Sequence, residues 1–303
     1  MSRWRDIVRI HRLEYPFPVN YLCHAVLGAC YAASSDVQQL CTAPVLLSII
    51  ANLLSIVGGN PLNAAVDVST DAHTQGKRDI AHAALRLGRN HAMSWTATEM
   101  TFALAVAIAT ALWLDRALIA VGVALTIALC LLYNLEPVRL KRRGFANPLT
   151  IGLTTGLLPS LVSYSAVRPD LTASVWLIFI GLGALITGRA IWWTVPDQIG
   201  DKETGMTTPT VQYGASQAIV IACVVTVAGL GLLGWGLWWR HGPLWALLGV
   251  AVSGAFLISK LALLRRLSNY ALPNPTQLRR RDLSSVMIAD ILLVLLPLAA
   301  RGT

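Results

Sequence analysis

The stretch GGNPLNAAVDVSTD, residues 58–71, ends a long apolar run and carries polar side chains at a fixed spacing. Asn63, Asp67 and Asp71 are four residues apart, so steps of about 100° per residue place them on one face of a helix. A second pair with the same spacing, Asp197 and Asp201, also ends an apolar run. Carboxylate and amide oxygens on two helices suit hard divalent cations such as Mg²⁺, which proteins commonly bind together with substrate phosphates. The two clusters therefore predict a site for a metal-bound diphosphate.

Long apolar stretches dominate the chain. Of its 303 residues, 55% are hydrophobic and 13% are charged, against about 25% charged residues in a typical soluble domain. A helix of about 20 apolar residues is long enough to cross a bilayer. Such stretches occupy residues 17–35, 44–62, 95–113, 117–135, 149–167, 172–193, 215–238, 243–264 and 284–301. The sequence therefore predicts an all-α, polytopic membrane protein with nine transmembrane helices.

Positive charge is divided unevenly between the two ends of these helices. The net charge is +9, and most Lys and Arg residues fall on the side that holds the N-terminus and the long loops. The opposite side carries only Arg116, Arg168, Arg240 and Arg301. The positive-inside rule places the basic side, and with it both acidic clusters, in the cytoplasm. Topology and the lipid bilayer account for the basicity, so nucleic acid is not expected as a partner.

The order of the motifs indicates an internal repeat. One acidic cluster ends the second span and the other ends the sixth, while basic loops follow the fourth and eighth spans. This pattern predicts two similar four-helix halves plus one helix around a central cavity. Residues 1–303 then form a single membrane-embedded domain. Within it, residues 1–16 form a basic, amphipathic segment that either lies on the cytoplasmic membrane surface or is a frayed tail.

Basic and aromatic residues flank both clusters. Lys77 and Arg78 follow the first cluster and either bind phosphate oxygens or act only as topology signals. Lys141 is one of four cations in residues 139–143, where the fourth span meets water. Trp192 and Trp193 precede the second cluster, either as interface residues or as the lining of a prenyl pocket.

Taken together, these segments resemble the UbiA superfamily of membrane prenyltransferases. That family carries N-x3-D-x3-D after its second helix and D-x3-D after its sixth. Its linking loop resembles the stretch from Tyr133 through Lys141 to Asn147, and residues 197–205 resemble its second acidic motif. The resemblance covers about residues 10–300, and the run from Asp71 through Arg78 also resembles the chlorophyll-synthase and menaquinone-type branches.

The resemblance implies a ring of nine helices around a lateral-opening cavity that is capped by cytoplasmic loops. Two Mg²⁺ ions would be bound by Asn63, Asp67, Asp71, Asp197 and Asp201. The diphosphate of an isoprenyl donor would be held by Lys77, Arg78, Lys141 and Lys202, with Tyr133 and Asn147 nearby. The partners are then a prenyl diphosphate, a hydrophobic or aromatic acceptor and the lipid bilayer.

The predicted chemistry follows from charge. Loss of diphosphate leaves an allylic cation and concentrates negative charge on the leaving group, which metal ions and cationic side chains stabilise. An electron-rich acceptor then attacks the cation. Asp197 and Asp201 are the catalytic candidates, and Asp197 is the group expected nearest the acceptor. Glu99 and Asp290 lie deeper in predicted spans and either line the cavity or pair with polar neighbours.

Two other functions share some of these features. A UbiA-type terpene cyclase would use the same metal site, with the prenyl chain itself quenching the cation. A transporter also uses intramembrane acids, but near the middle of the membrane. The acids here lie at the ends of spans, which favours an enzyme.

Overall fold

The described part of the chain is almost entirely helical. The computed structural model describes residues 3–34, 36–73, 77–267 and 275–300, and within these ranges the only β-type pairing is an isolated bridge between Arg143 and Thr207. The predicted span ends at residues 35 and 301 lie outside these ranges. The membrane-length segments are α2 (Phe17–Ala33), α3 (Ala43–Val57) continued by α4 (Gly59–Val66), α7 (Arg89–Leu114), α8 (Ala117–Asn134), α9 (Ala146–Gly152) continued by the π-helical turn η3 (Leu153–Leu157) and α10 (Leu158–Val167), α11 (Ala173–Trp193), α14 (Ala215–His241), α15 (Pro243–Leu267) and α16 (Pro275–Ala299).

These segments agree with the predicted spans. Among the described residues, eight helical segments are long and apolar enough to cross a membrane. The remaining predicted span corresponds to α2, whose 17 residues are slightly short of that length, so the count of nine is approximate. Several helices extend past the predicted spans: α7 begins at Arg89, before the predicted residue 95. Helical hydrogen bonding continues past the apolar stretch because polar side chains at a helix end can face water.

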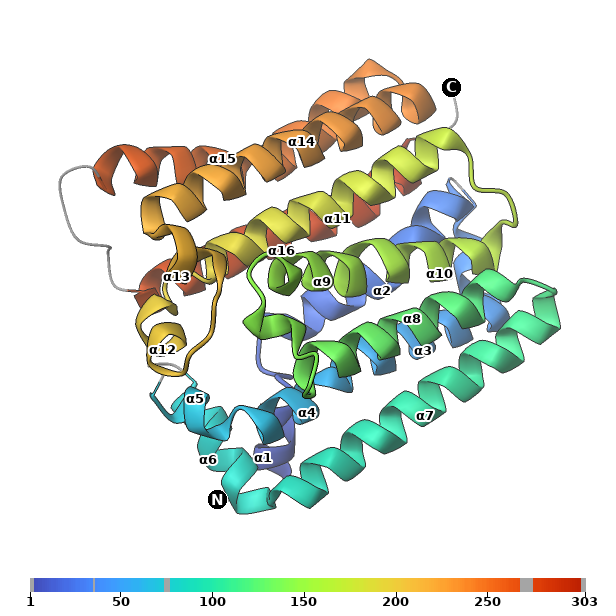
Figure 1. Cartoon of the computed structure of the whole chain (residues 1–303). Helices are drawn as coiled ribbons and strands as arrows, with labels where there is room; N and C mark the ends of the chain where they lie inside the picture. The colour runs from blue at the N-terminus through green and yellow to red at the C-terminus, as the bar shows by residue number, and fades with distance from the viewer. Residues whose placement is uncertain (1–2, 35, 74–76, 268–274, 301–303) are drawn as a thin grey trace.

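Short helices gather at one end of the bundle, which we call the polar end. They are α1 (Arg3–Ile10), α5 (Val68–His73), α6 (Arg78–Leu87), α12 (Gln198–Glu203) and α13 (Pro209–Tyr213), with η2 (Leu140–Arg142) between α8 and α9. Figure 1 shows α1, α5, α6 and α12 on the same side as the N-terminus, while the long helices run away from them. The 3-10 helix η1 (Val37–Cys41) lies in the connection between α2 and α3.

Helix contacts close the bundle around an interior space. Consecutive spans pack against each other in both predicted halves, and α16 contacts both α15 and α2. The pair α11 and α14 packs especially closely, because a Cβ atom added at Gly181 would lie 2.6 Å from the backbone nitrogen of Leu233. Small residues allow such approach between membrane helices. This packing holds α11, which leads into the second acidic cluster, in a fixed position.

The N-terminal segment is a docked helix in the described residues 3–16. Trp4 of α1 is 70% exposed, whereas Ile10 is fully buried. Asp6 accepts hydrogen bonds of 2.9 and 2.6 Å from Arg86 of α6. These contacts hold α1 (Arg3–Ile10) against α6 and leave the side chain of Trp4 exposed; the role of residues 1–16 at the membrane surface stays a prediction.

Candidate functional site

A cavity of about 360 Å³ opens between the helices at the polar end. Its lining includes all five predicted metal ligands, Asn63, Asp67, Asp71, Asp197 and Asp201. It also has an apolar wall of Phe17, Ile56, Ile151, Ile186, Leu283 and Val286. Acidic side chains from both predicted halves therefore line the same cavity as a set of apolar side chains.

The first cluster keeps its one-face arrangement across a helix break. Helix α4 ends at Val66, and Asp67 connects it to α5 with φ −104° and ψ 13°. The backbone N–H of Asp67 still donates to the carbonyl of Asn63 at 3.0 Å, and that of Asp71 to Asp67 at 2.8 Å. Because the i to i+4 bonds continue, the three side chains face the cavity together, as the spacing predicted.

The second cluster lies at the start of α12. Asp197 is the residue before the helix, and the backbone N–H of Asp201 donates to its carbonyl at 2.9 Å. The hydroxyl of Thr208 donates to Asp201 Oδ2 at 3.0 Å. Burial, together with the nearby charge of Asp197, raises the pKa of Asp201 to about 6. Asp201 is therefore a carboxyl whose ionisation depends on its surroundings near neutral pH.

Cationic side chains neutralise the two clusters. Lys77 Nζ lies 3.0 Å from Asp197 Oδ2 and 3.9 Å from Asp71 Oδ1, so it bridges the clusters. Lys141 forms an ion pair with Asp67, whose other oxygen lies 3.1 Å from Arg139 Nη2. These cations occupy the positions in which a metal ion would compete for the same carboxylates.

The donor set fits Mg²⁺ that is bound jointly with a diphosphate. In the described ranges, no three His, Cys, Asp or Glu side chains converge on one point as a metal site. Mg²⁺ rarely needs such a cage, since it is usually held by one or two carboxylates, with phosphate oxygens and water completing six ligands. Each cluster has two carboxylates, and Asn63 adds an amide oxygen to the first cluster. These groups could provide the one or two protein ligands that each Mg²⁺ ion needs.

The other predicted site residues divide into two groups. Tyr133 and Asn147 line the cavity, with the Tyr133 hydroxyl donating to Asn147 Oδ1 at 3.2 Å. Asn147 Nδ2 donates to the carbonyl of Lys141 at 2.9 Å and so positions that loop. Arg78 and Lys202, in contrast, are exposed and lie outside the cavity lining. Each directly follows a cavity residue, and one residue along a helix turns the side chain by about 100°.

The two tryptophans are both interior residues. Trp193 lines the cavity. Trp192 is buried, donates to Asp282 Oδ2 at 2.7 Å and lies 3.9 Å from Lys260 Nζ. The interface-belt interpretation is therefore wrong for Trp192. Lys260 in turn forms an ion pair with Asp282, which joins α15 to α16.

Several polar cavity residues were not predicted as part of the site. Arg12 lines the cavity and donates to Asn63 Oδ1 at 3.0 Å. Asn20, His24 and Arg189 also line it. A sequence signal existed for Arg189, because an arginine inside a predicted span is a functional candidate by default. Glu99, in contrast, is explained by its ion pair with His11 at 3.1 Å, which ties the N-terminal segment to α7.

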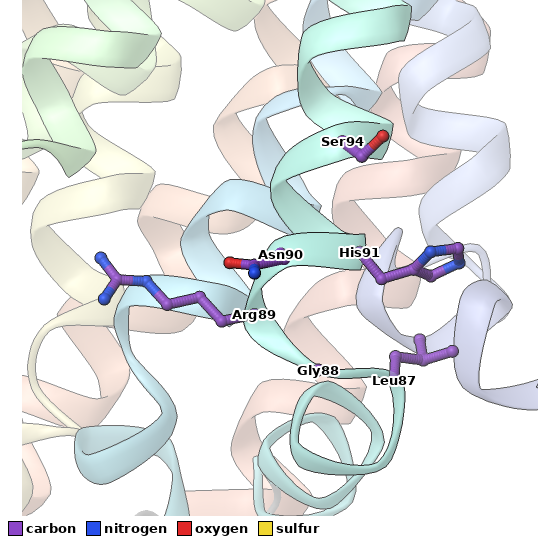
Figure 2. Close-up of a pocket in the computed structure, with 6 residues that line it drawn as sticks. All are labelled: Leu87, Gly88, Arg89, Asn90, His91 and Ser94. Carbon is purple, nitrogen blue, oxygen red and sulfur yellow. The ribbon is translucent and has the colours of Figure 1, made fainter.

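A second hollow lies on the surface where α6 meets α7. It is lined by Leu87, Gly88, Arg89, Asn90, His91 and Ser94. Figure 2 shows the side chains of Arg89 and His91 pointing in opposite directions. Because its polar groups do not converge, this hollow lacks the arrangement that the central cavity has.

The fold and the cavity define a polytopic membrane protein whose interior cavity holds two clusters of carboxylates. A model of the UbiA prenyltransferase family matches residues 21–272, and the chain belongs to that family. Among curated relatives, a homogentisate phytyltransferase from Synechocystis sp. is 30% identical over 143 residues, 45% of this chain and 44% of that protein. The match thus spans less than half of that relative. A 4-hydroxybenzoate octaprenyltransferase from Pseudomonas aeruginosa is 23% identical over 75% of this chain and 72% of that protein.

Solved structures share the fold along nearly the whole chain. A UbiA homologue from Archaeoglobus fulgidus, bound to GPP and Mg²⁺, superposes with a TM-score of 0.69 at 15% identity, covering 97% of this chain and 99% of that one. A digeranylgeranylglyceryl phosphate synthase superposes with a TM-score of 0.64 at 17% identity, covering 98% and 99% of the two chains.

Proposed function

We propose that the protein transfers an isoprenyl group from a polyprenyl diphosphate to an aromatic or other nucleophilic acceptor, with Mg²⁺, and releases diphosphate. The observation that carries this proposal is the meeting of two acidic clusters, Lys77 and Lys141 with an apolar wall in one cavity. A polar head with a long hydrocarbon tail suits both surfaces at once. The whole chain acts as one catalytic domain in this proposal.

The relatives support this assignment. One curated relative is named a homogentisate phytyltransferase and the other a 4-hydroxybenzoate octaprenyltransferase, so each name gives a prenyl group and an aromatic acid. The structural neighbour from Archaeoglobus fulgidus binds GPP with Mg²⁺. Prenyl diphosphate as donor and an aromatic compound as acceptor follow by analogy. The polar end, with its basic loops, would face the cytoplasm by the positive-inside rule.

The chain's own residues would perform most of the work. Asp67, Asp71, Asp197 and Asp201, with Asn63, would hold Mg²⁺, which supplies charge stabilisation for the departing diphosphate. Lys77 and Lys141 would turn from the carboxylates to the diphosphate oxygens. The apolar wall would hold the tail and exclude water from the allylic cation, which strengthens each of these electrostatic contacts.

The carbon–oxygen bond of the donor breaks first, its electron pair leaves with the diphosphate, and an acceptor carbon then forms the new bond with the allylic cation. The acceptor loses one proton, and Asp197, which lines the same cavity, would receive it. Atoms balance: acceptor and prenyl diphosphate give prenylated acceptor, diphosphate and a proton.

The test uses full-length protein reconstituted in lipid nanodiscs. Geranylgeranyl or farnesyl diphosphate, Mg²⁺ and a panel of phenolic acceptors would be supplied, with diphosphate release and product mass measured together. We expect a prenylated acceptor with wild-type protein and none with Asp67→Ala or Asp197→Ala. Asp170→Asn, at an exposed acid between α10 and α11, serves as the control. A cyclic hydrocarbon formed equally well without acceptor would refute transfer in favour of cyclisation.

A further inference from the structure

Three residues of a buried polar cluster on α2, α11 and α16 line the cavity, separate from the two acidic clusters. Asp290 of α16 accepts hydrogen bonds from Arg189 Nη1 at 2.8 Å and from Asn20 Nδ2 at 3.2 Å. His24 Nε2 lies 3.6 Å from the same carboxylate. The four residues come from α2, α11 and α16, and their exposed fractions are only 8% for Asn20 and His24, 3% for Arg189 and 1% for Asp290.

Three polar atoms of this cluster have unused hydrogen-bonding capacity. Within the described part of the chain, Arg189 Nη2, Asn20 Oδ1 and His24 Nδ1 are buried and have no hydrogen-bond partner. The same three residues line the cavity. Buried polar atoms in folded proteins are nearly always paired with protein, water or a ligand. Water or a polar group of a ligand would satisfy these three atoms.

The prenyl tail does not suit this wall. A hydrocarbon placed against Arg189 and Asn20 would leave their polar atoms without partners, whereas the apolar side chains Ile56, Ile151 and Ile186 of the same cavity would accept it. The diphosphate does not suit it either, because its counter-ions Lys77 and Lys141 lie at the acidic clusters. The remaining substrate is the acceptor.

Charge limits which acceptor group fits. Arg189 already matches the carboxylate of Asp290. A second carboxylate would be buried beside Asp290 without a cation of its own, which is strongly unfavourable. A neutral hydroxyl has no such penalty, since its oxygen can accept from Arg189 Nη2 while its proton is donated to Asn20 Oδ1.

We propose that Asn20, His24 and Arg189 form the subsite for a neutral phenolic hydroxyl of the acceptor, with Asp290 as a positioning residue that holds Arg189. The assignment rests on the proposed transfer function. It deepens that function by specifying an uncharged phenol, rather than a carboxylate, beside Asn20 and Arg189.

The first experiment measures binding without turnover. Saturation-transfer NMR in nanodiscs would compare 4-methylphenol with its methyl ether, which cannot donate, and with 4-methylbenzoate, which is anionic. We expect the phenol to bind at least about ten-fold more tightly than either analogue, because each leaves a buried partner unsatisfied. Equal affinity of the three probes, or preference for the carboxylate, would overturn the subsite.

The second experiment measures kinetics. Arg189→Met alone would leave Asp290 buried without its counter-ion, so the variants are Asn20→Leu and the charge-neutral pair Arg189→Gln with Asp290→Asn. We expect the KM for a phenolic acceptor to rise about ten-fold or more, and the preference for phenol over methyl ether to disappear, with the donor KM changed less than about two-fold. Thr110→Val, which removes a buried hydroxyl that bonds only within α7, controls for polar loss inside the membrane.

The two proposals fail in different ways. Wild-type protein that binds the phenol but forms no prenylated product under any donor would refute the proposed function. Wild-type transfer that proceeds normally, with unchanged acceptor KM and unchanged phenol preference in folded variants, would refute the subsite alone. Folding of each variant is checked by its elution volume and thermal unfolding in the same lipid.

Discussion

Replacing Lys77 by Met should change metal affinity and turnover in opposite directions. Lys77 Nζ lies 3.0 Å from Asp197 and 3.9 Å from Asp71, with its side chain 22% exposed. In the proposed function it would therefore compete with Mg²⁺ for one carboxylate of each cluster. In the complex with donor, the same ammonium would instead neutralise diphosphate oxygens.

The magnitude follows from the strength of such contacts. Two unit charges about 4 Å apart attract by about 4 kcal/mol at an effective dielectric of about 20. Most of this is offset by desolvation, so a hydrogen bond to a charged group contributes about 1.5–3 kcal/mol net. Lys77→Met should therefore lower kcat/KM for the donor by about 10- to 100-fold. Without donor, Mg²⁺ should bind several-fold more tightly, because its cationic competitor is gone.

Two measurements separate the effects. Isothermal titration of donor-free protein with Mg²⁺ reports metal affinity, and initial rates of diphosphate release report turnover. Lys77→Arg, which keeps the charge, is the matched variant and should retain most of both values. If Lys77→Met weakened metal binding as well as turnover, Lys77 would be a structural residue and the competition described here would be refuted.

Three further changes test the helix contacts and the acidic clusters. Lys260→Met should destabilise the protein by about 3–5 kcal/mol, because it leaves Asp282 buried without its cation. The double variant with Asp282→Asn should recover most of this stability in thermal unfolding, and an equal loss of stability in the single and double variants would contradict the ion pair's role. The rate of diphosphate release should rise with pH through about 6, because burial raises the pKa of Asp201 to about 6 and only an ionised carboxylate binds metal. A higher Mg²⁺ concentration should move this rise in rate to lower pH. A rise whose position does not depend on Mg²⁺ would argue against Asp201 as a ligand. Gly181→Ala should destabilise the protein by about 1–3 kcal/mol, since the new Cβ would lie 2.6 Å from a backbone nitrogen of α14 that cannot move aside; an unchanged melting temperature would show that α11 and α14 separate easily.

Most of the fold was predictable because the membrane imposes a simple rule. Each crossing needs a long apolar helix, so hydropathy alone located the spans. Their ends were less predictable: α7 continues to Arg89 and α3 is divided from α4 at Gly58. The residue at which a helix ends depends on which side chains contact water or a neighbouring helix, and amino-acid composition does not reveal these contacts.

The carboxylates of the site were predictable from spacing, whereas several of its cations were not. The i to i+4 rule brought Asp67 and Asp71 to one face even across a helix break. Lys202 was predicted by its position in a motif, yet it is exposed, because the phase of a short helix is set by its packing. The pairing of Arg189 with Asp290 joins residues 101 positions apart, and only the folded helix order reveals it.

The pairing of α11 with α16 also has a consequence for how the protein is made. As the chain emerges from the ribosome, Arg189 enters the bilayer well before α16 is synthesised, so its guanidinium lacks the counter-ion that Asp290 provides. An unmatched arginine in a membrane helix costs about 2.5–3.5 kcal/mol on insertion scales. The pairing of α11 with α16 therefore forms only after α16 has been synthesised. Chains interrupted before residue 275 would leave Arg189 without this counter-ion.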